Sequence, residues 1–251
     1  MMERQHPVWT STLEVFLLSP NRRPEEDGVT IPSYGPGALD ELDDAERQRA
    51  AAFRRPADRD LYVAAHIALR RVLATYVGIP ARKLTFARAD CPRCGGPHGR
   101  PVLAEPGPVP HFSLSHSHGT ALIAVAARPV GADVERLPAS ERVEVCLPSL
   151  HPHEQAELRR LEGEDRRAAF ARIWARKEAY LKGTGAGIGR WMSEVYVGDG
   201  GPGAPRGPDG WTVRDVPCPA GHAAAVALHG TPPTHTVVRE LPGDLRSLTS
   251  H

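Results

Sequence analysis

Apolar residues recur at intervals of three and four along two stretches of the chain, and this spacing predicts two long helices. The first is expected to follow Pro56, which ends a shorter helix at residues 42–53, and Asp58 is expected to cap it. The second is predicted over residues 165–182, and Gly183 is expected to end it.

Short apolar runs bounded by glycine, proline or polar clusters predict the strands. These runs lie at residues 15–18, 112–127, 130–137, 211–216 and 222–228, with a turn at His118-Gly119 dividing the second run. A further short helix is expected near residues 152–154. Loops are expected where glycine and proline are dense, at residues 90–110 and 198–210.

The same order of elements occurs twice along the chain. One long helix precedes the apolar strand at residues 121–127, and the other precedes the apolar strand at residues 223–228. We therefore expect an α+β fold of two similar halves, residues 1–127 and 128–251, related by pseudo-twofold symmetry. The active site is expected in the cleft between them. Two unrelated halves would also fit this pattern.

Composition narrows the class of protein. The 251 residues are 41% hydrophobic and 24% charged, which is ordinary for a soluble globular protein. Lys and Arg number 31 against 30 Asp and Glu, so a general nucleic-acid coat protein is excluded and any anion site must be local. The N-terminus lacks the apolar core of a signal peptide, and the run at residues 121–127 is too short to span a bilayer. We expect a cytoplasmic protein without membrane association.

Only three basic residues are lysines, and two of them, Lys177 and Lys182, fall in one predicted helix. The arginine side chain ends in a planar, fork-shaped guanidinium, whereas the lysine side chain ends in a compact ammonium. Their placement therefore suggests a position that requires an ammonium, although chance would also explain so small a number.

Two carboxylates are predicted on one face of a strand. Side chains alternate along a strand, so Asp133 and Glu135 in the segment at residues 131–135 point the same way. Neighbouring carboxylates repel unless a cation lies between them, and a hard divalent cation with oxygen ligands meets that need. A solvated strand face is the alternative interpretation.

A second polar group lies on the helix predicted at residues 165–182. Trp174, Glu178 and Lys182 are spaced by four residues and form one stripe. The stripe presents a carboxylate and an ammonium one turn apart, beside a glycine-rich segment at residues 183–187. An ordinary surface ion pair with Trp174 in the core has the same spacing.

Hydroxyl and imidazole groups end the strand at residues 112–119, where they suit a phosphate. Ser115 and His116 are adjacent and should point to opposite faces, which argues against a nucleophile–base pair. Upstream, Arg100 supplies a guanidinium for the same anion. Cys91-Pro92-Arg93-Cys94 is half of a zinc site with His98 as a possible third ligand, and a tight loop ahead of Arg100 is the interpretation we favour.

Taken together, these motifs resemble the 4′-phosphopantetheinyl transferases of the surfactin-synthetase-activating (Sfp) type. That family shows Gly-(Lys/Arg)-Pro, Phe-x-x-Ser-His-Ser, Gly-x-Asp-x-Glu and Trp-x-x-Lys-Glu-Ala-x-x-Lys in this order. Here they stand at residues 99–101, 112–117, 131–135 and 174–182. Each motif is weak alone, whereas the ordered set is specific.

The resemblance implies transfer of the phosphopantetheine arm of coenzyme A to a serine of an acyl or peptidyl carrier protein, with adenosine 3′,5′-bisphosphate as the other product. It implies Mg²⁺ as cofactor, held by Asp133, Glu135 and Glu178. Glu178 would also be the general base, and Lys182 would bind the pyrophosphate and stabilise charge in the transition state. A monomer is expected, acting in fatty-acid, polyketide or nonribosomal-peptide synthesis.

The resemblance also implies that Ser115 and His116 bind the phosphates of coenzyme A. Arg100 and Arg54 would reach its nucleotide end. Many relatives carry an arginine where Leu61-Tyr62 stand here, and Arg59 is a candidate to replace it.

Two other functions use the same residues. A metal-dependent phosphoesterase acting on a nucleotide would replace the serine hydroxyl with water. A non-catalytic relative would bind carrier protein or nucleotide only, although the intact acidic residues argue against it.

Overall fold

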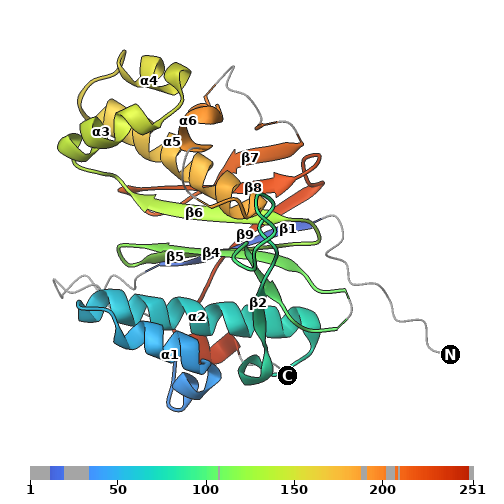
Figure 1. The fold of residues 1–251 in the computed structure, drawn as a ribbon. Coiled ribbons are helices and arrows are strands. Elements are labelled where there is room, and N and C mark those ends of the chain that lie inside the picture. The colour runs from blue at the N-terminus through green and yellow to red at the C-terminus, as the bar shows by residue number, and fades with distance from the viewer. Residues whose placement is uncertain are drawn as a thin grey trace.

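Two β-sheets lie face to face in the middle of the protein, and a long helix covers the outer side of each (Figure 1). This arrangement is seen in a computed structural model that describes residues 12–19, 34–106, 108–187, 191–201, 207–208 and 210–248. The observed α+β class agrees with the sequence prediction. The pseudo-twofold relation between two halves stays a prediction.

The first sheet has the strand order β4-β5-β1-β9. Its strands are β4 (His111–Ser117), β5 (Thr120–Ala126), β1 (Thr12–Leu18) and β9 (His235–Glu240). The predicted hairpin at His118-Gly119 is confirmed, and both residues have positive φ, 46° and 88°, as a two-residue turn with right-handed twist requires.

Strand β9 was not predicted. It lies in the C-terminal part of the chain yet pairs in parallel with β1, so chain order alone does not separate the two sheets. The predicted division at residues 127 and 128 stays a prediction.

The second sheet has the order β6-β8-β7, with β6 (Val130–Arg136), β8 (His222–His229) and β7 (Trp211–Asp215) all antiparallel. The closing hairpin predicted from residues 211–228 is therefore confirmed. Alternating residues of β1 and β5 pack against β6 and β8 and form the core between the sheets, which includes Val15, Leu122, Ala132 and Val226.

Helix α2 (Pro56–Val77) covers the first sheet and α5 (Gly163–Thr184) covers the second. Leu61, Ala65 and Leu69 of α2 face the sheet, while Tyr62 and Ile67 pack against the segment that contains α1. Helix α2 is therefore buried on two sides, which explains why it is apolar beyond a single stripe.

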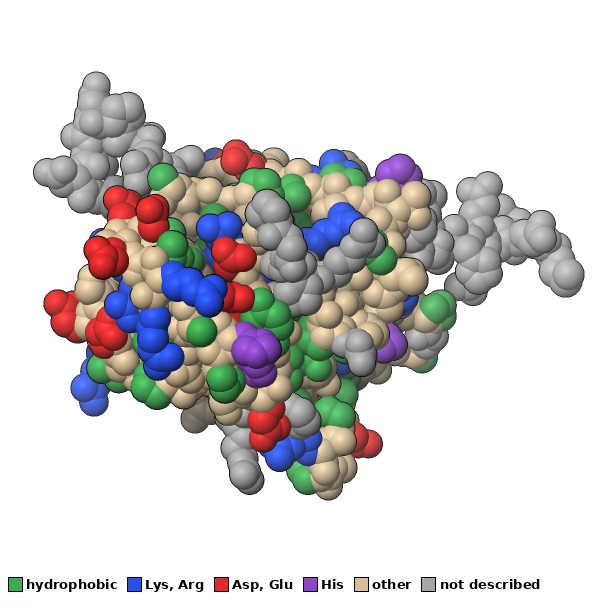
Figure 2. Space-filling model, turned by 90° about the horizontal axis from the view of Figure 1, so that it is seen from above, with side chains coloured by type: hydrophobic (Ala, Val, Ile, Leu, Met, Phe, Trp, Pro, Cys, Tyr) green, Lys and Arg blue, Asp and Glu red, His purple; other side chains and the backbone are tan. Residues whose placement is uncertain are grey.

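The remaining elements lie around these four layers. They are α1 (Asp44–Ala51), β2 (Phe86–Arg88), β3 (Pro101–Leu103), α3 (Ser140–Cys146), α4 (Pro152–Leu158), α6 (Trp191–Glu194) and 3₁₀ turns at Ala38–Glu41, Ala81–Lys83, Leu147–Ser149 and Leu245–Leu248. In Figure 2, acidic and basic side chains intermingle on the end that carries α3 and α4. No described helix is both long enough and apolar enough to cross a membrane.

Three local predictions were wrong. Pro56 is the first residue of α2, and Asp58 lies in its first turn without capping it. Gly183 does not end α5, which continues to Thr184 and is closed by Gly185 in the left-handed conformation. Residues 90–110 are not all loop, because β3 pairs with β2 there. Much of the loop predicted at residues 198–210 lies outside the described residues.

Candidate active site

Lys182, Asp133 and Ser115 form a hydrogen-bonded group where the two sheets and α5 meet. The Lys182 ammonium donates to Asp133 Oδ1 at 2.6 Å and to Ser115 Oγ at 2.9 Å. Ser115 Oγ in turn donates to Asp133 Oδ1 at 2.8 Å. Lys182 and Ser115, 67 positions apart along the chain, thus bond to each other directly and also share Asp133 Oδ1 as an acceptor.

A row of serines attaches β4 to β6. Ser113 Oγ accepts the backbone N–H of Ala132 at 3.0 Å, and Ser117 Oγ donates to Glu135 Oε2 at 3.4 Å. Together with Ser115, these residues alternate along β4 and point toward β6. Sequence reasoning missed Ser113 and Ser117, although their period-two spacing was the available signal.

Two further carboxylates face this group. Burial raises the pKa of Glu178 to about 7, with added repulsion from Asp133 and Glu135. Burial also raises the pKa of Glu135 to about 7, again with repulsion from Asp133. Asp133 and Glu178 are only 2% and 5% exposed, and the convergence of the three acidic side chains on one ion stays a prediction.

This donor set fits a divalent cation. Asp133 Oδ2 is buried and has no hydrogen-bond partner, and Lys182 is the ammonium that touches Asp133 through its other oxygen. Hard carboxylate oxygens are the ligands that Mg²⁺ takes in proteins. Among the described residues, the one trio whose ligand atoms all lie within 4.8 Å of one another is Cys91, Cys94 and His98. The oxygens of Asp133, Glu135 and Glu178 are spaced more widely than this.

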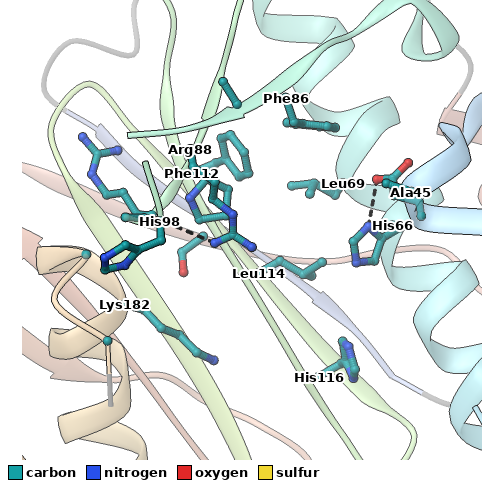
Figure 3. A pocket seen from close by; sticks show the side chains of 18 of the residues that line it. Ala45, His66, Leu69, Phe86, Arg88, His98, Phe112, Leu114, His116 and Lys182 are labelled. Atoms are coloured by element: carbon teal, nitrogen blue, oxygen red, sulfur yellow. Dashed lines mark hydrogen bonds and ion pairs between the residues drawn. The ribbon is translucent and has the colours of Figure 1, made fainter. Parts of the chain in front are cut away.

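A cavity of about 980 Å³ opens beside the carboxylates. Glu178 and Lys182 line it from α5. Residues of α1, α2, β2, β3 and β4 and of the segment at residues 97–100 also contribute to the wall. Figure 3 shows Lys182 on the opposite side of the cavity from Phe86 and His66. The cavity has the size of a pocket for a nucleotide-sized ligand.

Two arginines, Arg88 and Arg100, line this cavity. Arg88 donates to the backbone oxygen of Gly99 at 3.2 Å. Arg100 Nη1 is buried without a hydrogen-bond partner, and burial lowers the pKa of its guanidinium. A guanidinium with a buried, unused donor calls for an anionic ligand.

Aromatic and imidazole rings line another part of the wall. Tyr62 stacks on His66 with ring centroids 4.0 Å apart, and His66 Nδ1 lies 2.9 Å from Glu46 Oε1. Burial lowers the pKa of His116 to about 4, so its imidazole is neutral at pH 7. Sequence reasoning missed Tyr62, His66 and Glu46, whose only signal was the four-residue spacing of Tyr62 and His66 on one helix.

The predicted coenzyme A ligands divide into two groups. Arg100, His116 and Lys182 line the cavity, whereas Ser115 and Arg54 do not. Ser115 instead belongs to the Asp133 group, and Arg54 is exposed. Arg59, the suggested replacement for an arginine of the relatives, is paired with Asp60 at 2.9 Å. The roles of all these residues in binding coenzyme A remain predictions.

The second lysine of α5 has a different place. Lys177 is buried and paired with Glu154 Oε2 at 2.8 Å. Glu154 Oε1 also accepts the backbone N–H of Val197 at 2.9 Å. This ion pair holds α4 and the segment after α6 against α5, away from the cavity wall.

The fold and this site define an α+β protein with acidic side chains and an ammonium at the side of a cavity that two arginines also line. A model of the 4′-phosphopantetheinyl transferase superfamily matches residues 129–207, which include β6 and α5. Over this segment the chain is similar to the superfamily, and it resembles the Sfp and HetI types among its members.

Individual relatives show the same similarity. The putative 4′-phosphopantetheinyl transferase slr0495 of Synechocystis sp. is 31% identical over 172 residues, covering 67% of this chain and 65% of that protein. The 4′-phosphopantetheinyl transferase HetI of Nostoc sp. is 35% identical over 162 residues, covering 62% and 64%. Sfp of Bacillus subtilis is 22% identical over 144 residues, covering 57% and 60%. The chain thus spans just under two thirds of the length of these relatives.

Proposed function

We propose that this chain transfers the 4′-phosphopantetheine arm of coenzyme A to a serine of an apo acyl or peptidyl carrier protein. One observation carries the proposal: Lys182, which holds Asp133 beside Glu178 and Glu135, lies at the side of a cavity lined elsewhere by Arg88, Arg100 and stacked rings. Coenzyme A has a matching set of groups: a base, a ribose 3′-phosphate and the pyrophosphate at which transfer occurs.

In this proposal the arginines bind the nucleotide end of coenzyme A. Arg100 supplies the unused buried donor for a phosphate oxygen, and Arg88 lies beside it on the facing strand of the β2–β3 hairpin. Tyr62 and His66 offer flat apolar surface for the adenine. Because His116 is neutral, it can donate one N–H hydrogen bond to the ligand but brings no positive charge.

Asp133, Glu135 and Glu178 would hold the Mg²⁺ ion. When bound, this ion supplies positive charge to the pyrophosphate oxygens as they gain charge during transfer. Lys182 donates to the same oxygens from its place beside Asp133.

Glu178 is assigned the role of general base. Its carboxylate takes the proton of the acceptor serine as the serine oxygen forms a bond to the phosphorus nearer the pantetheine. The bond from this phosphorus to the bridging oxygen breaks, and adenosine 3′,5′-bisphosphate leaves with the electron pair. Positioning of the serine in line with that bond falls to the bound carrier protein.

Intact-protein mass spectrometry tests this function. The chain is incubated with coenzyme A, Mg²⁺ and a panel of apo carrier proteins from fatty-acid, polyketide and nonribosomal-peptide systems. The proposal predicts a mass gain of one phosphopantetheine group on at least one carrier, and none when coenzyme A is omitted. The carrier that reacts fastest identifies the class of partner.

Two results would contradict the proposal. Rapid release of phosphopantetheine without any carrier would identify a phosphoesterase. No modification of any carrier, combined with tight coenzyme A binding by calorimetry, would identify a non-catalytic binding protein.

A further inference from the structure

A second cluster of metal-binding side chains lies outside the proposed active site, at the tip of the β2–β3 hairpin. Cys91, Cys94 and His98 bring one ligand atom each within 4.8 Å of one another. Cys94 Sγ and His98 Nε2 are 3.0 Å apart. A tetrahedral zinc ion with ordinary bond lengths sets such sulfur–nitrogen separations at about 3.6 Å, so only a small shift is needed.

The backbone between these residues is folded around the Cys91 sulfur. The N–H groups of Arg93 and Cys94 donate to the Cys91 side chain. The Cys91 N–H donates to Gly96 O at 2.8 Å, and the Gly95 N–H donates to Cys91 O at 2.9 Å. Gly95 has a φ of 71°, which a residue with a side chain adopts rarely. These turns hold the Cys91 sulfur beside the ligand atoms of Cys94 and His98.

We propose that Cys91, Cys94 and His98 bind one zinc ion. Two thiolates and an imidazole are ligands that zinc prefers, and binding releases the protons of the two thiols to solvent. Cys91 is buried, whereas Cys94 and His98 are exposed, so the fourth coordination position faces water. The tight loop expected from the sequence is present, and its turns place the three side chains together.

The zinc site is connected to the cavity through the same hairpin. Ala89 donates to Arg100 O at 3.0 Å, and Gly99 donates to Ala89 O at 2.8 Å. A Cβ on Gly99 would lie 2.5 Å from Ala89 O, so the two strands are in close contact. His98 and Arg100 both line the cavity. The ion therefore cross-links the hairpin tip and keeps Arg100 in place, a positioning role that rests on the proposed function, whereas zinc binding itself does not.

Metal content tests the site directly. The untagged full chain is purified under reducing conditions without chelator, and zinc is measured by plasma mass spectrometry beside the variants Cys94→Ala and Cys146→Ser. We expect one zinc ion per chain in the wild type and in Cys146→Ser, and loss of zinc from Cys94→Ala. Cys146 is the matched control because it is a partly exposed cysteine outside the cluster.

A cobalt spectrum makes the test independent of the variants. Wild-type protein stripped of metal and titrated with Co²⁺ should show a thiolate-to-cobalt charge-transfer band that saturates at one equivalent. Absence of this band from folded protein with reduced thiols would overturn the proposal. A Cys91–Cys94 disulfide in protein purified without oxidant, with zinc no higher than in Cys94→Ala, would also overturn it.

If the chain binds zinc but does not transfer phosphopantetheine, the zinc measurements are unaffected and only the predicted effect on transfer kinetics cannot occur. That consequence is a several-fold rise in KM for coenzyme A in Cys94→Ala, with kcat close to that of the wild type.

Discussion

Gly131 of β6 and Gly183 of α5 pack with their backbones in contact. A Cβ on Gly131 would lie 2.4 Å from Gly183 N and 1.9 Å from Ala179 O. This contact sets how closely α5 approaches the second sheet. Asp133, two residues along β6, then lies beside Lys182, the residue that precedes Gly183.

Gly131→Ala is expected to separate α5 from β6. Because the clash is with backbone atoms, the substitution should cost at least about 3 kcal/mol of unfolding free energy, the upper part of the range for overpacking. Urea denaturation measures this loss. Gly163→Ala, at the other end of α5 with no atom within 4 Å, is the control. Its positive φ of 56° should cost only about 1 kcal/mol. Equal losses for the two variants would contradict the account.

Lys182 should be irreplaceable by other side chains. Its compact ammonium donates to both Asp133 Oδ1 and Ser115 Oγ. Lys182→Met removes this charge, and we expect kcat for transfer to fall by about 10²–10³, as for loss of a transition-state donor. Lys182→Arg should recover little of the lost kcat, since a planar guanidinium does not fit the position of the ammonium between Asp133 and Ser115. Lys83→Met, which changes the exposed third lysine, should leave kcat unchanged.

The buried pair of Lys177 and Glu154 should matter for stability rather than transfer. Lys177→Met leaves the Glu154 carboxylate buried without its cation and should cost about 3–5 kcal/mol of unfolding free energy. Adding Glu154→Gln removes the stranded charge while keeping an acceptor for Val197, so the double variant should regain part of this loss. A double variant less stable than Lys177→Met would show that the ion pair is not the cause.

The strands and the helix stripe could be predicted from the sequence because they depend on local spacing. The alternation along β6 placed Asp133 and Glu135 on one face, and the four-residue spacing on α5 placed Glu178 and Lys182 on one stripe, whereas their meeting around one ion came only from the family resemblance and stays a prediction. The sequence placed Lys182 on the stripe with Glu178, but it could not show that Lys177 is buried against Glu154, because that pairing depends on the packing of α4.

Tertiary contacts explain most of what the sequence did not show. Gly183 has the local signature of a helix end, but its missing side chain serves the contact with Gly131 instead. Strand β9 is mostly exposed and has little apolar pattern, since it lies at a sheet edge. The cavity wall at Tyr62 and Arg88 forms where α2 meets a hairpin that the pattern did not predict.

Two partly buried histidines should make stability depend on pH. Burial lowers the pKa of His111 and His116 to about 4 each, below the value of about 6.5 in an unfolded chain. Between these values the unfolded state binds more protons, so their contribution to stability is present above about pH 6.5 and is lost as the pH falls toward about 4.

Urea denaturation of the wild type and of His111→Gln/His116→Gln, from about pH 7.5 down to about pH 5, measures this contribution. The double variant should lose less stability on acidification than the wild type. The same loss in both proteins would show that neither histidine is held neutral by the fold.

The central claim is that Asp133, Glu135 and Glu178 act with Lys182 as one site for phosphopantetheine transfer. The most direct test is the rate at which apo carrier protein gains mass with Glu178→Gln beside the wild type, at equal concentrations of folded protein with coenzyme A and Mg²⁺. The account predicts a fall of about 10²–10⁴ with an unchanged fold, the range for loss of a general base. A rate near that of the wild type would contradict it.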